Sequence, residues 1–215
     1  LIKEVGQPLV GPSANTSGRP SPTQRQHVYH DLKGKIEGIL EGGSTEIGVE
    51  STVLDLSDPI QPPMILRPGA VTKEQLEEEL GSEVLVDKHL LKESEAPRSP
   101  GMKYKHYAPN TKVLMIHSDD WQKAVAWGNN HQLRIGVLSG PAIAEEVRAS
   151  TAAVFMYAND SVQSATKGLF AGLRALDDPK LQLDIIFVQT FPEVGLGTAY
   201  MNRLKKSAGQ KFFEK

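Results

Sequence analysis

Hydrophobic and polar residues alternate most regularly in the second half of the chain, after Thr111. Four short apolar runs there predict strands, and the segments after them have the spacing of amphipathic helices. The predicted strands are Val113–Ile116, Leu133–Leu138, Ala152–Met156 and Asp184–Val188; helices are predicted from Ser118 or Asp119 onward and over Pro141–Arg148, Ser161–Leu176 and Thr198–Ser207. This alternation predicts a parallel sheet with helices on its faces.

The first half of the chain has a weaker pattern, which predicts part of a mixed α/β domain. Strands are predicted at Val49–Leu56 and Met64–Leu66, with a weaker candidate at Ile36–Leu40, and a short helix from Pro22 to about Leu32. A second helix, ending at Leu80, is better defined. Thr72 and Gln75 fit a capping box at its start, and Gly81 is a typical residue for its end.

The chain opens on a segment, Leu1–Gly6, that has the composition of a last helical turn and its glycine stop. We therefore expect about the N-terminal half of the first domain to be missing. Residues 82–110 lose periodicity, and the polar stretch 93–100 contains two prolines, which is typical of a linker. The predicted organisation is a first domain over 1–81, a linker over 82–110 and a second domain over 111–215.

Composition excludes several classes of protein. The 215 residues carry a formal net charge of −2, so bulk charge does not indicate binding to nucleic acid or to a membrane surface. The absence of cysteine excludes disulfides and thiolate metal sites, and no apolar run is long enough to span a bilayer. His27 and His30 are the closest histidine pair, but they lack further ligands at suitable spacing, so no metal site is predicted. A cytoplasmic location is expected.

The stretch with the most distinctive composition is Gly11–Thr23, which we call the signature loop. It follows a short apolar run and is rich in proline, glycine and hydroxyl side chains, which suits a shaped loop at the end of a strand. Its serines and backbone N–H groups could donate to anionic oxygens, although an ordinary surface loop has a similar composition. Arg67, before a Pro-Gly turn, could hold a phosphate or carboxylate; a surface salt bridge is the alternative.

Four stretches, in this order, resemble the YrdC-like threonylcarbamoyl-AMP synthases of the long, two-domain type. They are the signature loop, Glu50–Leu56, Ile65–Ala70 and Ser99–Pro109. The resemblance implies the C-terminal part of a YrdC-like mixed α/β domain, then a linker and a small Rossmann-like parallel α/β domain. It also implies ATP contacts at Ser13, Ser21, Arg67, His106 and Tyr107, and L-threonine contacts at Gly11 and Ser51.

The activity implied by this resemblance is that of a nucleotidyltransferase. L-threonine, bicarbonate and ATP, with Mg²⁺ bridging phosphates, would give L-threonylcarbamoyladenylate and pyrophosphate for the threonylcarbamoyladenosine modification of tRNA. Positioning and charge neutralisation would do most of the chemistry, so no catalytic side chain is assigned. Because further ATP contacts of the family lie in the missing half, we expect this fragment alone to be inactive or nearly so.

Two other interpretations remain open. An RNA-binding module of YrdC-like fold would use the small basic cluster at Lys103, Lys105 and His106, but net charge and the lack of an RNA-binding signature disfavour it. A carbamoyl-transfer maturation factor would be expected to carry zinc-finger and acylphosphatase-like segments, and none is found. Either tRNA or the downstream tRNA-modifying transferase complex is a further candidate partner.

Overall fold

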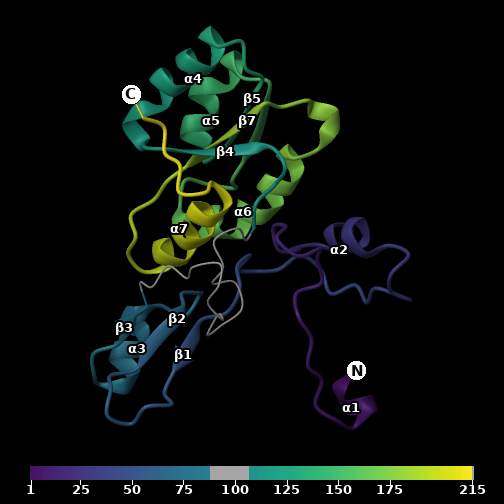
Figure 1. Cartoon of the computed structure of the whole chain (residues 1–215), viewed down its shortest axis with the longest axis vertical. Coiled ribbons are helices and arrows are strands. Elements are labelled where there is room, and N and C mark those ends of the chain that lie inside the picture. Colours follow the sequence, from purple (N-terminus) through teal and green to yellow (C-terminus); the bar gives the residue numbers. More distant parts are fainter. Residues whose placement is uncertain (88–106, 215) are drawn as a thin grey trace.

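The computed structural model describes residues 1–87 and 107–214 (Figure 1). We call these two parts the first unit and the second unit. The first unit contains α1 (Ile2–Val5), α2 (Arg25–Leu32), β1 (Val53–Asp55), β2 (Met64–Arg67), α3 (Lys73–Leu80) and β3 (Leu85–Val86). Its sheet has the order β1-β2-β3, with β1 antiparallel and β3 parallel to β2.

The second unit is a four-stranded sheet in which every neighbouring pair is parallel, in the order β4-β7-β5-β6. Its elements are β4 (Lys112–Ile116), η1 (Ser118–Asp120), α4 (Trp121–Asn130), β5 (Ile135–Ser139), α5 (Pro141–Val147), η2 (Arg148–Ser150), β6 (Ala153–Met156), α6 (Val162–Leu176), η3 (Pro179–Leu181), β7 (Ile185–Gln189) and α7 (Leu196–Ser207). The prediction of a Rossmann-like parallel sheet is confirmed.

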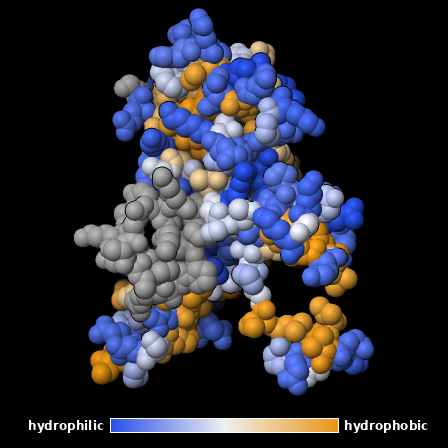
Figure 2. Space-filling view, turned by 45° about the vertical axis from the view of Figure 1, so that its right-hand side comes forward, coloured by the Kyte–Doolittle hydropathy of each residue, from blue (hydrophilic) through white to orange (hydrophobic). Residues whose placement is uncertain are grey.

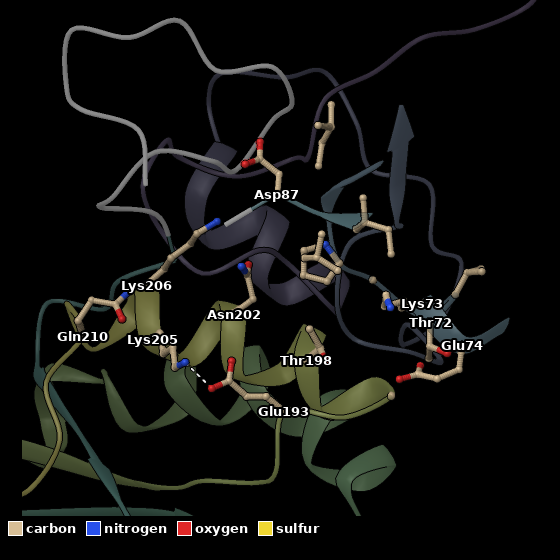
Figure 3. A pocket seen from close by; sticks show the side chains of 17 residues that line it. Thr72, Lys73, Glu74, Asp87, Glu193, Thr198, Asn202, Lys205, Lys206 and Gln210 are labelled. Atoms are coloured by element: carbon tan, nitrogen blue, oxygen red, sulfur yellow. Dashed lines mark hydrogen bonds and ion pairs between the residues drawn. The ribbon is translucent and has the colours of Figure 1, made fainter. Parts of the chain in front are cut away.

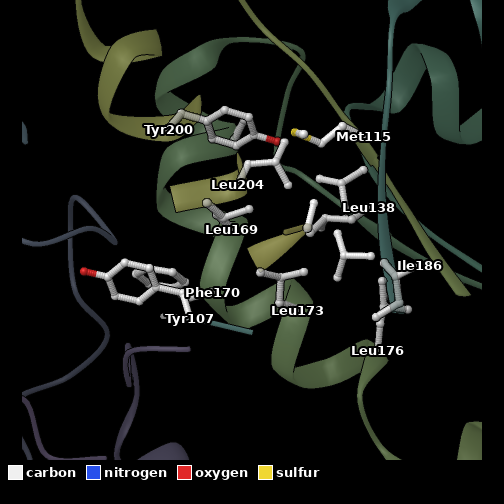
Figure 4. Close-up of a cluster of buried hydrophobic side chains, with 14 of the residues drawn as sticks. Tyr107, Met115, Leu138, Leu169, Phe170, Leu173, Leu176, Ile186, Tyr200 and Leu204 are labelled. Carbon is white, nitrogen blue, oxygen red and sulfur yellow. The ribbon is translucent and has the colours of Figure 1, made fainter. Parts of the chain in front are cut away.

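Helices cover both faces of this sheet (Figure 1). On one face, Trp121 of α4 and Val147 of α5 pack against Ile135 and Phe187 of the strands. On the other face, α6 and α7 form the cluster drawn in Figure 4, in which side chains such as Leu173 meet the strands. Because each face is closed by its own pair of helices, the second unit has a complete core.

The first unit, by contrast, buries little apolar surface. Within 1–87 only Ile65 and Val84 belong to the buried hydrophobic residues. Large apolar side chains such as Val10, Leu40 and Ile60 are exposed, and Figure 2 shows hydrophobic surface gathered over these N-terminal parts. Contacts with the second unit must therefore contribute much of the order in the first.

Most predicted elements form, with four differences. Ile36–Leu40, a weak strand candidate, is not a strand; Ile36 is 39% and Leu40 84% exposed, and a strand needs a partner ladder. The helix predicted from Pro22 begins at Arg25, and the strand predicted over Val49–Leu56 is reduced to β1. In addition, β3 lies inside the range predicted as linker, where its N–H groups extend the sheet beyond β2.

Close backbone packing in the first unit depends on Gly69. A Cβ at this position would lie 2.3 Å from the backbone nitrogen of Thr52 and 2.6 Å from the carbonyl oxygen of Glu50. Neither atom can move like the end of a flexible side chain. The Arg-Pro-Gly turn after β2 therefore fits against the Glu-Ser-Thr stretch only when its last residue is glycine.

Replacing Gly69 by alanine is expected to lower the free energy of unfolding by about 1–3 kcal/mol, the usual cost of overpacking. Gly42→Ala is the matched control, since no atom lies within 4 Å of its added Cβ. It should change stability by less than about 0.5 kcal/mol. Denaturant unfolding of both variants measures the difference; equal stabilities would show that the turn relaxes at no cost.

Candidate functional site

Two of the predicted site residues, Arg67 and Ser51, are in direct contact. Arg67 ends β2, and its Nε donates to the Ser51 carbonyl oxygen at 3.0 Å while Nη2 donates to the Ser51 hydroxyl oxygen at 3.2 Å. The Thr52 hydroxyl donates to the Val71 carbonyl at 2.6 Å. Together with the close packing at Gly69, these bonds join the Glu-Ser-Thr and Arg-Pro-Gly stretches into one surface.

Glu50 connects this surface to the signature loop. One of its carboxylate oxygens accepts a hydrogen bond from the Ser21 hydroxyl, and the other accepts from Arg203 Nε at 2.9 Å. Burial by itself would raise the pKa of the Glu50 carboxyl, but the charge of Arg203 and the bond from Ser21 hold that pKa below its usual value. Glu50 is therefore an ionised acceptor for both partners.

Arg203, on α7 of the second unit, is completely buried. Besides the Glu50 carboxylate, its guanidinium donates to the Pro68 carbonyl and, at 3.4 Å, to the Glu50 carbonyl. It also lies 6.0 Å from the centre of the Tyr107 ring. A single buried cation thus contacts both the Glu-Ser-Thr and the Arg-Pro-Gly stretches and reaches the signature loop through Glu50.

Tyr107 begins the second unit and is placed beside this cluster. Its φ of 68° is in the left-handed region, its ring packs against Phe170 at 5.1 Å, and its carbonyl accepts from the Ser207 hydroxyl at 2.9 Å. Burial and the neighbouring Glu50 carboxylate raise the pKa of the Tyr107 hydroxyl to about 12.

The residue after Tyr107 bonds to the signature loop. The amide of Ala108 donates to the Gly18 carbonyl at 3.0 Å. His106 lies outside the described residues.

A second arginine holds the other side of the signature loop. Arg174 of α6 donates from Nε (3.0 Å) and Nη2 (2.6 Å) to the Pro20 carbonyl, and it forms a two-pronged ion pair with Asp31 at 3.0 and 2.7 Å. Asp31 also accepts from the Thr16 amide at 3.1 Å. These bonds hold the pKa of the buried Asp31 carboxyl well below its usual value, against the opposing effect of burial.

His27 has a structural role in the same region. Its Nδ1 lies 3.1 Å from the Thr23 amide, which donates to it. Burial and the nearby Arg174 charge lower the pKa of His27 to about 4, so the ring is neutral at pH 7. Among the residues that the structure describes, no group of three or more His, Asp or Glu could hold a metal ion.

The structure places the remaining predicted site residues differently. Gly11 and Ser13 are exposed in the extended start of the signature loop. The Ser13 carbonyl accepts from the Asn15 amide at 3.0 Å. Neither residue has a hydrogen bond to Glu50, Ser51 or Arg67 among the bonds described for the first unit. Of the predicted residues, the structure therefore joins Ser51 with Arg67, and brings Ser21 and Tyr107 to the same cluster through Glu50 and Arg203.

A cavity of about 620 Å³ lies between β2, α3 and α7, next to Pro68 and Gly69 (Figure 3). Asn202, Lys205 and Lys206 of α7 line one wall, and Lys205 forms an ion pair with Glu193. Burial and the charge of Arg203 lower the pKa of Lys206 to about 8. The two units thus meet over a surface that combines apolar side chains from the first unit, such as Ile65 and Val86, with the lysines of α7.

Sequence reasoning missed Arg203, Arg174 and Glu50 as organising residues. A signal for Arg203 was present, because it falls on the buried face of α7 with Ala199 and Ser207 at intervals of four. A cation on the apolar face of a helix must find a partner. Arg203 also lies in the C-terminal half of α7, where the helix dipole favours cations, and this local reason explains an arginine there without a partner in the other unit.

The chain belongs to the threonylcarbamoyl-AMP synthase family. A family model described as "Threonylcarbamoyl-AMP synthase, C-terminal domain" matches residues 71–209, and a second, described as "Telomere recombination", matches residues 1–69. The chain is 43% identical over 214 residues to the threonylcarbamoyl-AMP synthase of Bacillus subtilis, covering 97% of this chain. The match spans 59% of the length of that relative.

Two solved structures of Sua5 from Pyrococcus abyssi are similar as well. One, complexed with L-threonine, has a TM-score of 0.86 at 36% identity, covering 99% of this chain and 61% of that chain. The other, in which a histidine and the adjacent tyrosine are replaced by alanine, has a TM-score of 0.85 at 35% identity, covering 99% of this chain and 60% of that chain. These findings confirm the predicted family and α/β fold class. No helix in the described ranges is long and apolar enough to cross a membrane.

The Arg174–Asp31 pair leads to a prediction with a defined pH dependence. Asp31→Asn leaves the Arg174 charge buried without its partner and should lower the free energy of unfolding by about 3–5 kcal/mol at pH 7. Because the folded-state pKa of Asp31 is depressed, its stabilisation is present above the unfolded pKa of about 4 and is lost as pH falls below it. The difference between variant and parent should therefore shrink from pH 5 downward.

Chemical denaturation at a series of pH values measures this difference. Asp119→Asn, at an exposed position of the second unit, is the control and should stay within about 0.5 kcal/mol throughout. A destabilisation by Asp31→Asn that is equally large at pH 3 and pH 7 would contradict the ionic origin of the effect.

Proposed function

We propose that the protein to which this chain belongs makes L-threonylcarbamoyladenylate from L-threonine, bicarbonate and ATP, releasing pyrophosphate. The observation that carries the proposal is the Arg67–Ser51 contact. It unites a residue proposed for phosphate with one proposed for L-threonine in a chain of the threonylcarbamoyl-AMP synthase family. Threonine, ATP and bicarbonate are proposed as its substrates, and the product is proposed to serve tRNA modification in the cytoplasm.

Site roles follow the sequence prediction. Ser13, Ser21, Arg67, His106 and Tyr107 are proposed ATP contacts. One solved P. abyssi structure has an adjacent histidine and tyrosine replaced by alanine. His106-Tyr107 is the one His-Tyr dipeptide in this sequence, which supports the proposed role of these two residues.

Gly11 and Ser51 are proposed contacts to L-threonine, in keeping with the P. abyssi Sua5 complex with that amino acid. The Ser51 hydroxyl oxygen accepts from Arg67, so its hydrogen is directed away from Arg67. It can therefore be donated to a substrate oxygen. Ser51 is thus suited to a ligand that presents an acceptor, as a carboxylate does.

The proposed chemistry has two steps. The threonine amine adds to the carbon of bicarbonate with loss of water, giving a carbamate. A carbamate oxygen then attacks the α-phosphorus of ATP, the bond from that phosphorus to the bridging oxygen breaks, and pyrophosphate leaves with the electron pair. Charge accumulates on phosphate oxygens, where Arg67 can neutralise it. The protein mainly has to orient the two substrates and to exclude water from the mixed anhydride.

Mg²⁺ is proposed to enter with the nucleotide. When bound, it would neutralise the charge of the phosphates. The described residues hold no cluster of three or more His, Asp or Glu, so no protein ligand set is proposed for the ion. The alternative of an RNA-binding module gains no support from the comparisons over the synthase. Either tRNA or the downstream tRNA-modifying transferase complex is proposed as a partner.

Pyrophosphate release from ATP tests the proposed function directly. It should be measured with and without L-threonine and bicarbonate, on this chain and on a longer chain extended at its N-terminus to the natural start codon. Release that needs both substrates and occurs only in the longer protein is expected. The absence of substrate-dependent release from the longer protein would refute the synthase, and equal turnover by the 215-residue chain would refute the expected inactivity of the fragment.

Ser51→Ala separates the two substrate sites. Loss of one hydrogen bond should raise the KM for L-threonine about tenfold, corresponding to ~1.4 kcal/mol, with the KM for ATP little changed. Steady-state kinetics of the extended protein measures both constants. Ser118→Ala, on the exposed surface of the second unit, should alter neither. A rise in the KM for ATP alone would move Ser51 to the nucleotide side.

A further inference from the structure

We propose that Arg203 is a positioning residue for the nucleotide: through Glu50 it orients the Ser21 hydroxyl so that Ser21 accepts a hydrogen bond from a donor group of the ribose or base. The inference rests on the proposed function, since Ser21 is a nucleotide contact only within it. It gives α7 of the second unit an indirect part in nucleotide binding, although that unit carries no phosphate-binding sequence of its own.

The Arg203 side chain makes most of its described hydrogen bonds outside its own unit. The side chain belongs to the second unit and is fully buried, yet it donates to Glu50 and Pro68 in the first unit. Within its own unit, the described bond goes to the adjacent Asn202 at 3.4 Å. Figure 1 shows α7 on the side of the second unit that faces the small sheet. The buried charge is thus paired mainly across the boundary between the units.

The Ser21 hydroxyl has a single hydrogen to donate. It is donated to the Glu50 carboxylate, so toward any ligand Ser21 presents only lone pairs. Phosphate oxygens are acceptors and do not pair with such a group. A ribose hydroxyl or an adenine amino group is a donor and does. The geometry therefore assigns Ser21 to the nucleoside end of ATP and leaves the phosphates to Arg67.

Arg203 is required for Ser21 to donate its hydrogen to Glu50. Glu50 accepts from Ser21 as long as it is ionised, and the adjacent guanidinium keeps it so despite burial. Arg203 also fixes the carboxylate plane by bonding at the same time to the Pro68 carbonyl. Arg174 restrains the same loop through the backbone of Pro20, so the two arginines act on different parts of it.

Arg203→Lys in the full-length protein is the test. The ammonium keeps the buried positive charge, but it lacks the planar fork that reaches Glu50 and Pro68 together. We expect the KM for ATP to rise at least tenfold while kcat stays within about threefold and the KM for L-threonine within about twofold. Arg134→Lys is the matched control: its arginine bonds the Leu181 carbonyl within the second unit, and both KM values should be unchanged.

A second variant, Glu50→Gln, keeps the shape and an acceptor oxygen but removes the charge. It should raise the KM for ATP by a similar factor, and the double variant should be no worse than the worse single variant, because both act through Ser21. An unchanged KM for ATP in Arg203→Lys, accompanied only by a lower melting temperature, would overturn the proposal.

The proposed synthase activity and the proposed role of Arg203 can fail independently. Absence of pyrophosphate release by the parent protein refutes the synthase, whatever the variants do. Equilibrium binding of ATP to parent and variants then still decides the role of Arg203: at least tenfold weaker binding by Arg203→Lys, with Arg134→Lys unchanged, supports it, and equal binding refutes it.

Discussion

The buried charge of Arg203 is the constraint on which the rest of this structure depends. A guanidinium removed from water is costly unless it is paired and hydrogen-bonded. Here the pairing is supplied by Glu50 and Pro68 of the other unit, so neither unit satisfies its polar groups alone. The same two residues belong to stretches that were singled out as functional. The arrangement that pairs the buried Arg203 guanidinium is therefore the same one that forms the site.

This arrangement explains how a unit with so little core of its own can be ordered. Hydrophobic contacts are adaptable, and the first unit has few that are fully buried. Charged hydrogen bonds have preferred directions, and the second unit supplies them from two helices, through Arg174 and Arg203. The well-packed second unit acts as a rigid support, and the signature loop takes its shape from that support more than from its own sequence.

Sequence patterns predicted the second unit well because each strand and helix there carries its own periodic signal, as in Ser161–Leu176. The capping box at Thr72 was equally local and was also confirmed. The strand predicted over Ile36–Leu40 was wrong, because a strand depends on a partner strand that composition does not reveal. The site was predictable only in part: Arg67 and Ser51 were named from their motifs, whereas Glu50 and Arg203 act across 153 positions of sequence.

The long-range character of these bonds has a consequence for the connection between the units. The contacts of Arg203 and Arg174 with the first unit join residues that lie 135 to 154 positions apart in the sequence, the shortest separation being Arg203 to Pro68 and the longest Arg174 to Pro20. Loop-closure entropy grows only with the logarithm of loop length, so a doubling of the separation costs about 0.6 kcal/mol. Directed side-chain contacts, rather than closeness in the sequence, therefore hold the units in register.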